Sequence, residues 1–212
     1  SFKLINVSTD EVYGSLKKNQ KSFTELNKFY PNSPYSASKA SGDLLARAWN
    51  KTFNIPIITT NSSNNYGPWQ FPEKLIPVVI SNCLKGINIP VYGNGTNVRD
   101  WLYVEDHIEA LIKISKFVKT GSNFNIGGGK EVTNISLVKK ICSILDELEP
   151  RFFKYAKLIE FVNDRPGHDF RYSINFNKLK KELNYEPKIE FELGLLKTIK
   201  WYINNKKWLF KK

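Results

Sequence analysis

The chain of 212 residues has only two cysteines, no methionine and no long apolar run. Cys83 and Cys142 both fall in apolar segments with helical spacing, which predicts buried free thiols rather than a disulfide framework. No Cys and His spacing fits a zinc site, so we expect no metal. No run approaches the roughly 20 apolar residues of a membrane-spanning helix, and the amino end has no signal-peptide pattern. We therefore expect a cytoplasmic protein that does not contact a membrane.

Acidic residues are scarce relative to basic ones, which leaves a net charge of +12. The lysines are spread over almost every segment, and this favours a solvated basic surface over nucleic-acid binding. Positive charge of this kind would also attract a diphosphate substrate. The absence of Met, and a first residue that already lies within a strand pattern, predict a fragment that lacks its amino-terminal part.

The first feature that is present is the apolar run Phe2 to Val7, followed directly by Ser8, Thr9, Asp10 and Glu11. Open α/β sheets bind ligands at the carboxyl ends of their strands, where these polar side chains would lie. Two adjacent carboxyl groups in different surroundings can act as one acid and one base. An ordinary acidic loop after a strand would have the same sequence, so the pair alone leaves both interpretations open.

A predicted helix begins at Ser33-Pro34 and continues toward Trp49. On it Tyr35 and Lys39 lie four residues apart and therefore share one face. A tyrosine that acts as a base near neutral pH needs its pKa lowered from about 10 by about three, which is worth roughly 4 kcal/mol. One cation about 4 Å away supplies roughly that amount at an effective dielectric near 20. We expect Lys39 to activate Tyr35, although such pairs also arise by chance.

Short strands and longer helices alternate along the rest of the chain. The patterns predict strands over 55–60, 89–93, 98–104, 124–126 and 158–162, and helices over 72–84, 105–118, 134–148, 177–183 and 191–208. This alternation is typical of an α/β fold with a parallel sheet. Two glycine clusters, 93–95 and 127–129, fail as dinucleotide fingerprints because Val98 and Val132 stand where the third glycine should be.

Three motifs, in this order, resemble the extended short-chain dehydrogenase/reductases: Thr9-Asp10-Glu11 after the strand, Tyr35-Ser36-Ala37-Ser38-Lys39 on the helix, and Ser63-Asn64-Asn65-Tyr66-Gly67-Pro68 in the next loop. Within that superfamily the chain is most similar to the family of dTDP-glucose 4,6-dehydratases, because related epimerases and decarboxylases lack the adjacent Asp-Glu pair. The resemblance extends over essentially the whole chain. It implies a Rossmann-like, doubly wound parallel sheet, whose amino-terminal part is absent, and a smaller α/β substrate-binding domain.

The same resemblance implies how the chain divides. Residues 1–65 would be the carboxyl-terminal part of an NAD-binding Rossmann domain, and residues 66–212 a sugar-nucleotide domain, with segments near 98–127 returning to the first. The Gly-rich cofactor turn and the acidic residue for the adenosine ribose are absent from the chain. We therefore expect the isolated chain to bind NAD poorly and to be inactive.

The chemistry that the resemblance implies is conversion of dTDP-glucose to dTDP-4-keto-6-deoxyglucose with NAD as cofactor, a step toward deoxysugars such as dTDP-rhamnose. Tyr35 would take the proton of the sugar 4-hydroxyl, Thr9 would orient that oxygen, and Lys39 would hold the phenolate and the nicotinamide ribose. Glu11 would then remove the C5 proton and Asp10 would protonate the departing 6-hydroxyl, before hydride returns to C6. These roles require a raised pKa at Asp10 and an ionised Glu11, although the two could share them.

The remaining site residues are also assigned by the resemblance. Asn65 would contact the cofactor, and Arg99 would bind the diphosphate, which suits a guanidinium fork. Arg99 could instead pair with Asp100 or Asp106. Further substrate contacts would come from Asn64, Lys74, Leu75, Pro90, Tyr92, Asn134, Asp164, Arg165 and His168. His107, near a helix start, is expected to be a structural hydrogen-bonding group.

Two other functions stay open. The chain could belong to another extended sugar-nucleotide enzyme, such as a UDP-sugar 4-epimerase or a decarboxylase, which the pair Asp10-Glu11 argues against. It could also be a remnant that no longer catalyses and serves as a binding or dimerisation module. The presence of Thr9, Asp10, Glu11, Tyr35 and Lys39 together argues against a remnant. Because relatives pair through helices like the one over 34–53, we expect a homodimer.

Overall fold

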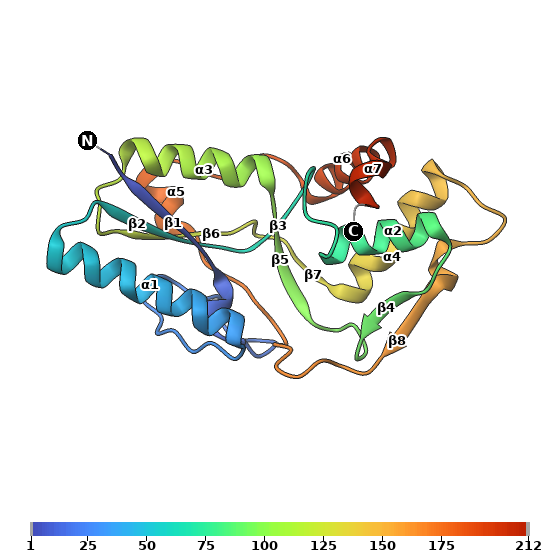
Figure 1. Cartoon of the computed structure of the whole chain (residues 1–212), viewed down its shortest axis with the longest axis horizontal. Coiled ribbons are helices and arrows are strands. Elements are labelled where there is room, and N and C mark those ends of the chain that lie inside the picture. Colours follow the sequence, from blue (N-terminus) through green and yellow to red (C-terminus); the bar gives the residue numbers. More distant parts are fainter. Residues whose placement is uncertain (1, 211–212) are drawn as a thin grey trace. The chain divides into compact units, whose positions relative to one another are not determined.

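The structure is a computed structural model that describes residues 2–210 (Figure 1). Its elements are β1 (Leu4–Thr9), η1 (Asp10–Tyr13), α1 (Pro34–Phe53), β2 (Ile57–Ser62), β3 (Asn64–Tyr66), α2 (Leu75–Lys85), β4 (Ile89–Tyr92), β5 (Val98–Tyr103), α3 (Val104–Phe117), β6 (Asn123–Ile126), β7 (Glu131–Thr133), α4 (Asn134–Leu148), η2 (Tyr155–Leu158), β8 (Ile159–Val162), α5 (Asn177–Leu183), α6 (Phe191–Asn204) and α7 (Lys206–Leu209). The predicted α/β fold with parallel strands is confirmed.

The chain forms two compact units. The first contains Ser1–Asn65, Arg99–Glu131 and Asp169–Lys188, and the second contains Tyr66–Val98, Val132–His168 and Ile189–Lys212. Our sequence-based division left residues 169–188 in the second part. They belong to the first unit because Phe23 N donates to Ser173 O at 3.0 Å and Asn175 N donates to Phe23 O at 2.7 Å. That the first unit binds NAD and the second a sugar nucleotide stays a prediction.

The first unit is built on a parallel sheet with the strand order β1-β2-β6. Thr9 is paired with Ser62, and Ser62 with Ile126, so the three strands end level with one another. The segments that follow the strands therefore start at one edge of the sheet, which is where open α/β sheets bind ligands.

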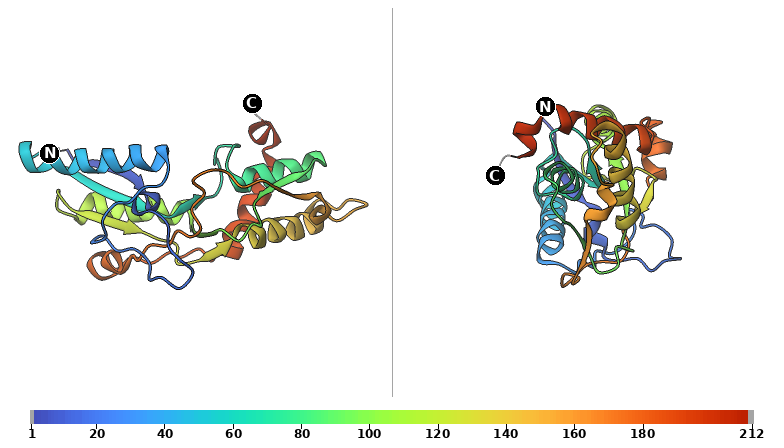
Figure 2. Two further views of the ribbon diagram at one scale, coloured as in Figure 1. Left: turned by 90° about the horizontal axis from the view of Figure 1, so that it is seen from below. Right: turned by 90° about the vertical axis from the view of Figure 1, so that its right-hand side faces the viewer.

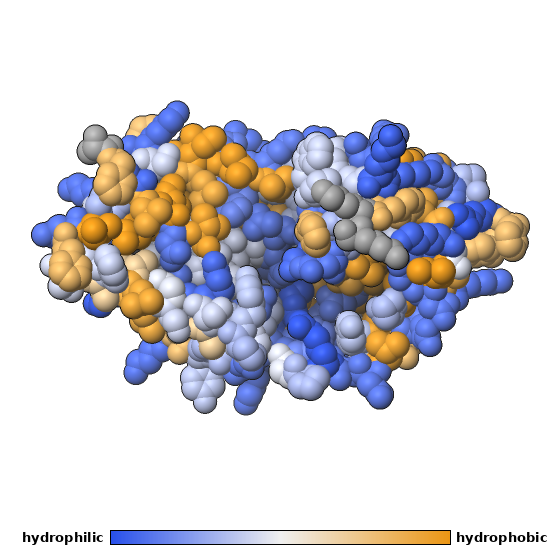
Figure 3. Space-filling view, viewed as in Figure 1, coloured by the Kyte–Doolittle hydropathy of each residue, from blue (hydrophilic) through white to orange (hydrophobic). Residues whose placement is uncertain are grey.

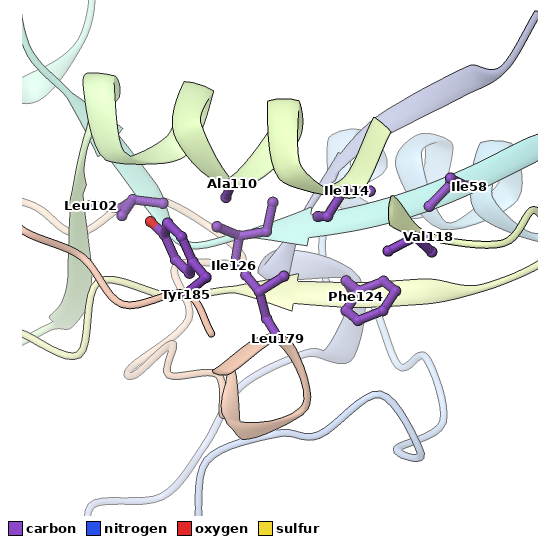
Figure 4. Packing of buried hydrophobic residues seen from close by; sticks show 9 residues of the cluster. All are labelled: Ile58, Leu102, Ala110, Ile114, Val118, Phe124, Ile126, Leu179 and Tyr185. Carbon is purple, nitrogen blue, oxygen red and sulfur yellow. The ribbon is translucent and has the colours of Figure 1, made fainter. Parts of the chain in front are cut away.

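Side chains of β2 alternate between two helices that cover opposite faces of this sheet (Figures 1 and 2). Ile58 belongs to one buried cluster with Ala110 and Ile114 of α3 (Figure 4). The other members of this buried cluster are Leu102, Val118, Phe124, Ile126, Leu179 and Tyr185. On the other face, Asn61 donates to Asp43 of α1 at 2.9 Å.

The second unit combines the helices α2, α4 and α6 with a two-stranded parallel sheet, β4-β8. Cys83 of α2 and Cys142 of α4 are buried and free, as predicted, and their Sγ atoms lie 4.0 Å apart. Trp201 and Trp208 both pack on Trp69, with ring centroids 4.9 and 5.2 Å from the centroid of Trp69.

Several elements differ from the predicted ones. The helix expected from residue 72 begins at Leu75, because Lys74 N bonds Phe71 O in a turn that precedes it. The helix expected over 191–208 is interrupted at Asn205, whose ψ of 47° is not helical. β3 and β7, each of three residues, are too short to show a periodicity, and they flank β5 in a second three-stranded sheet.

The turn after β6 depends on a residue without a side chain. A Cβ added to Gly128 would lie 1.8 Å from Trp101 O, a backbone atom of β5 that cannot move away. We expect Gly128→Ala to lower the free energy of unfolding of the full-length protein by about 3 kcal/mol or more, as overpacking against a fixed backbone does.

Urea unfolding measures this loss, and Gly42→Ala is the matched control. Gly42 lies inside α1 with no atom within 4 Å of the added Cβ, so its replacement should stabilise the protein by about 0.5–1 kcal/mol. Equal unfolding midpoints for the two variants would contradict the close approach at Gly128.

Within residues 2–210 no helix is long and apolar enough to cross a membrane. The same residues contain no group of three or more His, Cys, Asp or Glu side chains placed to hold a metal ion.

Candidate active site

Thr9, Asp10 and Glu11 lie at the end of β1, where the chain enters the short helix η1. Thr9 caps this helix, because its Oγ1 accepts a hydrogen bond from Glu11 N at 3.2 Å and donates one to Asp10 Oδ1 at 3.3 Å. Asp10 is 2% exposed, whereas Glu11 is only partly buried. The two adjacent carboxyl groups therefore have the different surroundings that an acid and base pair requires.

The environment of Asp10 favours its neutral form. Burial raises the pKa of Asp10 well above its usual value, and the negative charges of Glu11 and Asp100 raise it further, while Arg99 opposes them. Asp10 Oδ2 is buried and has no hydrogen-bond partner among residues 2–210. A raised pKa is the shift expected for a carboxyl group that donates a proton.

Tyr35 and Lys39 project from the first turns of α1. A capping box fixes the start of this helix, because Ser36 N donates to Ser33 Oγ and Ser33 N donates to Ser36 Oγ, both at 3.1 Å. Lys39 Nζ donates to Val7 O at 2.8 Å. Tyr35 is 57% exposed and can therefore contact a ligand.

The pKa of Tyr35 is shifted in the direction opposite to the one we predicted from Lys39 alone. Burial raises this pKa, and the negative charges of Glu11 and Asp10 raise it further. The prediction considered one neighbour on the same helix, whereas the fold adds two carboxyl groups from the end of β1. The phenol and the carboxyl pair are therefore close enough for the negative charges to act on Tyr35.

Arg99 is buried, and its Nη2 donates to Asp169 O at 3.0 Å. Its guanidinium carbon lies 4.4 Å from the centroid of the Tyr172 ring. This arrangement joins β5 to the segment after residue 168, and the charge of Arg99 also acts on Asp10. The predicted contact of Arg99 with a diphosphate stays a prediction.

Asp100 is a third carboxyl group at this site, and sequence analysis did not assign it a role. Its Oδ1 accepts from Lys130 N at 2.8 Å and its Oδ2 from Gly128 N at 3.1 Å. Burial raises the pKa of Asp100 to about 6, although these two hydrogen bonds act to lower it. Its position directly after Arg99 was the only available signal, because its effect on Asp10 depends on pairing between distant segments.

Asn64 and Asn65 follow β2, level with the carboxyl pair that follows β1. Asn64 Oδ1 is buried without a hydrogen-bond partner in the described part of the chain. Asn65 Nδ2 donates to Ser62 Oγ at 3.2 Å and to Ser63 O at 3.1 Å, so this amide shapes its own loop. Burial lowers the pKa of His107 to about 4, which keeps it neutral. Its buried Nε2 has no hydrogen-bond partner among residues 2–210, so the hydrogen-bonding role expected of it is not found at this atom.

A second group of predicted residues lies in the second unit, where β4 and β8 end side by side. His168 Nδ1 and Asp164 Oδ1 are 2.6 Å apart, and this hydrogen bond lowers the pKa of Asp164. The rings of Tyr92 and His168 meet edge to face, with centroids 6.4 Å apart. Arg165 N also donates to Asp164 Oδ1 at 2.9 Å. These residues form one polar and aromatic cluster at the strand ends.

The other predicted substrate residues of the second unit lie at the starts of helices or on β4. Lys74 and Leu75 lie at the start of α2, where Lys74 pairs with Glu73 at 3.2 Å. Pro90 lies in β4, and Asn134 begins α4. Asn134 Oδ1 is buried and lacks a hydrogen-bond partner within the described residues, so a ligand could supply one.

Comparisons with known proteins match the chain over almost its whole length. The profile of the family described as "GDP-mannose 4,6 dehydratase" matches residues 1–198. A dTDP-glucose 4,6-dehydratase of Haemophilus influenzae is 49% identical over 209 residues, which are 97% of this chain and 62% of that protein. The chain thus spans about three fifths of the length of the curated relatives it matches.

Solved structures agree with this match. A dTDP-glucose 4,6-dehydratase from Bacillus anthracis in complex with NAD is 50% identical with a TM-score of 0.89, and the similarity covers 97% of this chain and 63% of that one. A UDP-glucuronic acid 4-epimerase from Bacillus cereus, in complex with UDP-glucuronic acid and NAD, is 26% identical with a TM-score of 0.84, covering 96% and 62%. The chain therefore has the Rossmann-like fold that the sequence predicted. It covers about three fifths of the length of these two related structures.

Proposed function

Since the chain belongs to the GDP-mannose 4,6 dehydratase family, we propose that the protein of which it is part is a dTDP-glucose 4,6-dehydratase. This lyase would convert dTDP-glucose to dTDP-4-keto-6-deoxyglucose, a precursor of deoxysugars such as dTDP-rhamnose. The observation that carries the proposal is the pair of carboxyl groups after β1, one buried with a raised pKa and one accessible, both acting on Tyr35.

NAD is the cofactor that this function requires, and the residues after β1 and β2 fit it. Tyr35 is exposed, Lys39 Nζ is accessible, and Asn64 Oδ1 is a buried acceptor with no partner among residues 2–210. Tyr35, Lys39 and Asn65 would hold the cofactor. When bound, NAD would accept hydride from C4 of the sugar and return it to C6.

The chain's own residues would perform the proton transfers. Tyr35 Oη takes the proton of the sugar 4-hydroxyl, and Thr9 orients that oxygen. The resulting 4-keto group acidifies C5, from which Glu11 removes a proton. Asp10, held neutral by burial, gives its proton to the departing 6-hydroxyl, so that water leaves and the C5–C6 double bond forms.

The second unit would bind the nucleotide part of the substrate. Tyr92 would lie against the base, while Arg165 and His168 would contact the diphosphate. Arg99, which belongs to the first unit, is likewise proposed as a diphosphate ligand. Lys74, Leu75, Pro90, Asn134 and Asp164 would complete these contacts, and Asn64 would contact the sugar. The net charge of +12 would favour the approach of the anionic substrate.

The test is formation of a 4-keto sugar, which absorbs in alkali, after the full-length protein is mixed with NAD and dTDP-glucose. UDP-glucose and CDP-glucose serve as controls for the base. We expect product from dTDP-glucose above both. A C4 epimer without keto product would favour the 4-epimerase alternative, to which the 26% identical relative points, and no reaction with any substrate would favour a binding module.

A homodimer in the cytoplasm is also part of this proposal, and the outer face of α1 supports the dimer. Leu44, Leu45, Trp49 and Phe53 are between 52% and 65% exposed on this helix. An apolar area over α3, which carries the exposed Ile108 and Ile112, is a second candidate contact (Figure 3). Apolar helix faces of this kind are typical of subunit interfaces.

We expect Trp49→Glu to convert the full-length dimer to a monomer, because a carboxylate in an apolar contact stays unpaired and costly to bury. Sedimentation equilibrium measures the mass directly. Lys51→Glu, a charge change of the same helix two residues away, is the control and should leave the dimer intact. A Trp49→Glu protein that still sediments as a dimer would place the interface elsewhere.

A further inference from the structure

The face of α1 that carries Tyr35 and Lys39 continues to a carboxyl group that has no role so far. Asp43 lies four residues after Lys39, so Tyr35, Lys39 and Asp43 form one row along the helix. Asp43 is only 4% exposed, and it is one of three buried residues of the helix, with Ser36 and Ala40. Because a buried carboxylate is costly unless it is hydrogen-bonded, its position calls for an explanation.

Both oxygens of Asp43 accept hydrogen bonds from the sheet beneath the helix. Asn6 Nδ2 of β1 donates to Oδ1 at 2.8 Å, and Asn61 Nδ2 of β2 donates to Oδ2 at 2.9 Å. The same Asn61 nitrogen lies 3.2 Å from the carbonyl oxygen of Thr9. One amide group therefore connects the α1 carboxylate to the strand end that carries the catalytic pair.

Asp43 is also the nearest counter-charge of Lys39 along α1. Burial raises the pKa of Asp43, while the hydrogen bonds from Asn61 and Asn6 and the positive charge of Lys39 lower it. Other groups face the same carboxylate: its charge acts on buried Tyr13, and Glu25, Lys28 and Arg47 line a cavity beside it. Of these, Lys39 is the one whose ammonium is fixed at β1, through Val7 O.

We propose that Asp43 is a positioning residue of this site, which holds Thr9 through Asn61 and holds the ammonium of Lys39 through its charge. The catalytic part of this inference rests on the proposed function. Asp43 acts through these neighbours, because it lies buried between α1 and the sheet. This role explains why the row of Tyr35, Lys39 and Asp43 on α1 includes a buried acid, although an apolar residue would be less costly to bury at that position.

The first measurement does not depend on activity. In the full-length protein with Asp43→Asn, an amine-directed acylating reagent at constant pH should label Lys39 about three- to ten-fold faster, the effect of losing one nearby opposite charge. Mass spectrometry of the labelled peptide gives the rate. Lys51, which is exposed in the last turn of α1 and does not line this cavity, provides the internal reference. Equal labelling of Lys39 in the variant and the unaltered protein would overturn the charge relation.

The second measurement uses the dehydratase reaction. Asp43→Asn should lower kcat about ten-fold with little change in KM for dTDP-glucose, because the nucleotide contacts are untouched. The acid limb of kcat/KM should move to lower pH, because a negative charge two helical turns from Tyr35 would be removed. Lys51→Gln, an exposed change two turns further along α1 and away from this cavity, is the matched control and should leave both unchanged.

A purely structural role predicts a different pattern. Asp43→Ala would then lower the melting temperature and kcat together, with Lys39 labelling and the pH limb unchanged. The double variant Asp43→Asn with Asn61→Asp exchanges the two side chains, so that this pair again contains one carboxylate and one amide. Its kcat should be higher than that of Asn61→Asp alone. If the unaltered protein forms no keto sugar, the proposed function fails, and Lys39 labelling still decides the role of Asp43.

Discussion

The full-length protein with Glu11→Gln is expected to lose formation of the 4-keto-6-deoxy sugar by about 10²–10⁴-fold, the contribution typical of one general base. Glutamine has the shape of glutamate but cannot accept the C5 proton. The hydrogen bond that Thr9 Oγ1 accepts comes from the backbone N–H of residue 11, so the change leaves the cap of η1 intact. Absorbance of the product in alkali measures the loss.

The step at which Glu11→Gln stops distinguishes its role from a general disturbance of the site. Oxidation at C4 does not need the C5 base, so reduced cofactor should accumulate after dTDP-glucose is added. Its near-ultraviolet absorbance reports this directly. Glu73→Gln, an exposed change in the second unit, is the control and should turn over normally. A Glu11→Gln protein that makes product at the unaltered rate would refute the base assignment.

Asp10→Asn should also abolish product, and it should stabilise the protein. A carboxyl group whose pKa is raised by folding contributes stability below its unfolded-state pKa, and this contribution is lost as the pH rises through its folded-state pKa. The unaltered protein therefore bears a cost near neutral pH that an uncharged amide avoids. We expect the melting temperature of Asp10→Asn to exceed that of the unaltered protein near neutral pH. The difference between the two melting temperatures should be smaller in acid.

The order of elements could be predicted because each carries its own local signal. Ser33 and Pro34 mark the start of α1, and the structure adds the capping box that the pattern suggested only in part. The apolar stripe of α4 predicts that helix with its observed bounds, Asn134–Leu148. β3 and β7 could not be predicted, because three residues contain too little of the strand period.

The buried face of α1 shows why periodicity alone can mislead. Leu44 and Leu45 recur at helical spacing with Ala37, Ala40 and Ala48, yet they are 58% and 60% exposed. The face toward the sheet carries Ser36, Ala40 and Asp43, where small side chains allow close approach and Asn61 satisfies the carboxylate. An apolar residue on a helix predicts a contact, but the sequence does not say with which partner.

The candidate site was predicted where its residues are neighbours in the chain, and missed where folding brings them together. Thr9, Asp10 and Glu11 form one motif, and their different burial follows from the turn into η1. The place of Asp100 in the site depends on the pairing of β5 with the segment after β6, and no local sequence pattern indicates this pairing. The direction of the pKa shift at Tyr35 could not be predicted for the same reason.

Tyr35→Phe is expected to lower product formation by about 10³-fold, within the range for a lost acid or base group. Phenylalanine keeps the ring but has no oxygen to take the 4-hydroxyl proton, so the reaction should stop before the cofactor is reduced. This separates it from Glu11→Gln, in which reduced cofactor should accumulate. Tyr30→Phe, an exposed tyrosine of the preceding loop, is the control.

The carboxyl pair makes a further prediction about Tyr35 itself. Because burial and the charges of Glu11 and Asp10 raise the pKa of Tyr35, removal of one charge in Glu11→Gln should lower it. The rate of cofactor reduction in Glu11→Gln should therefore reach its plateau at lower pH than in Asp10→Glu, which keeps both carboxyl groups. Reduced cofactor in Tyr35→Phe, or coincident pH profiles for the two carboxyl variants, would show that another group takes the 4-hydroxyl proton.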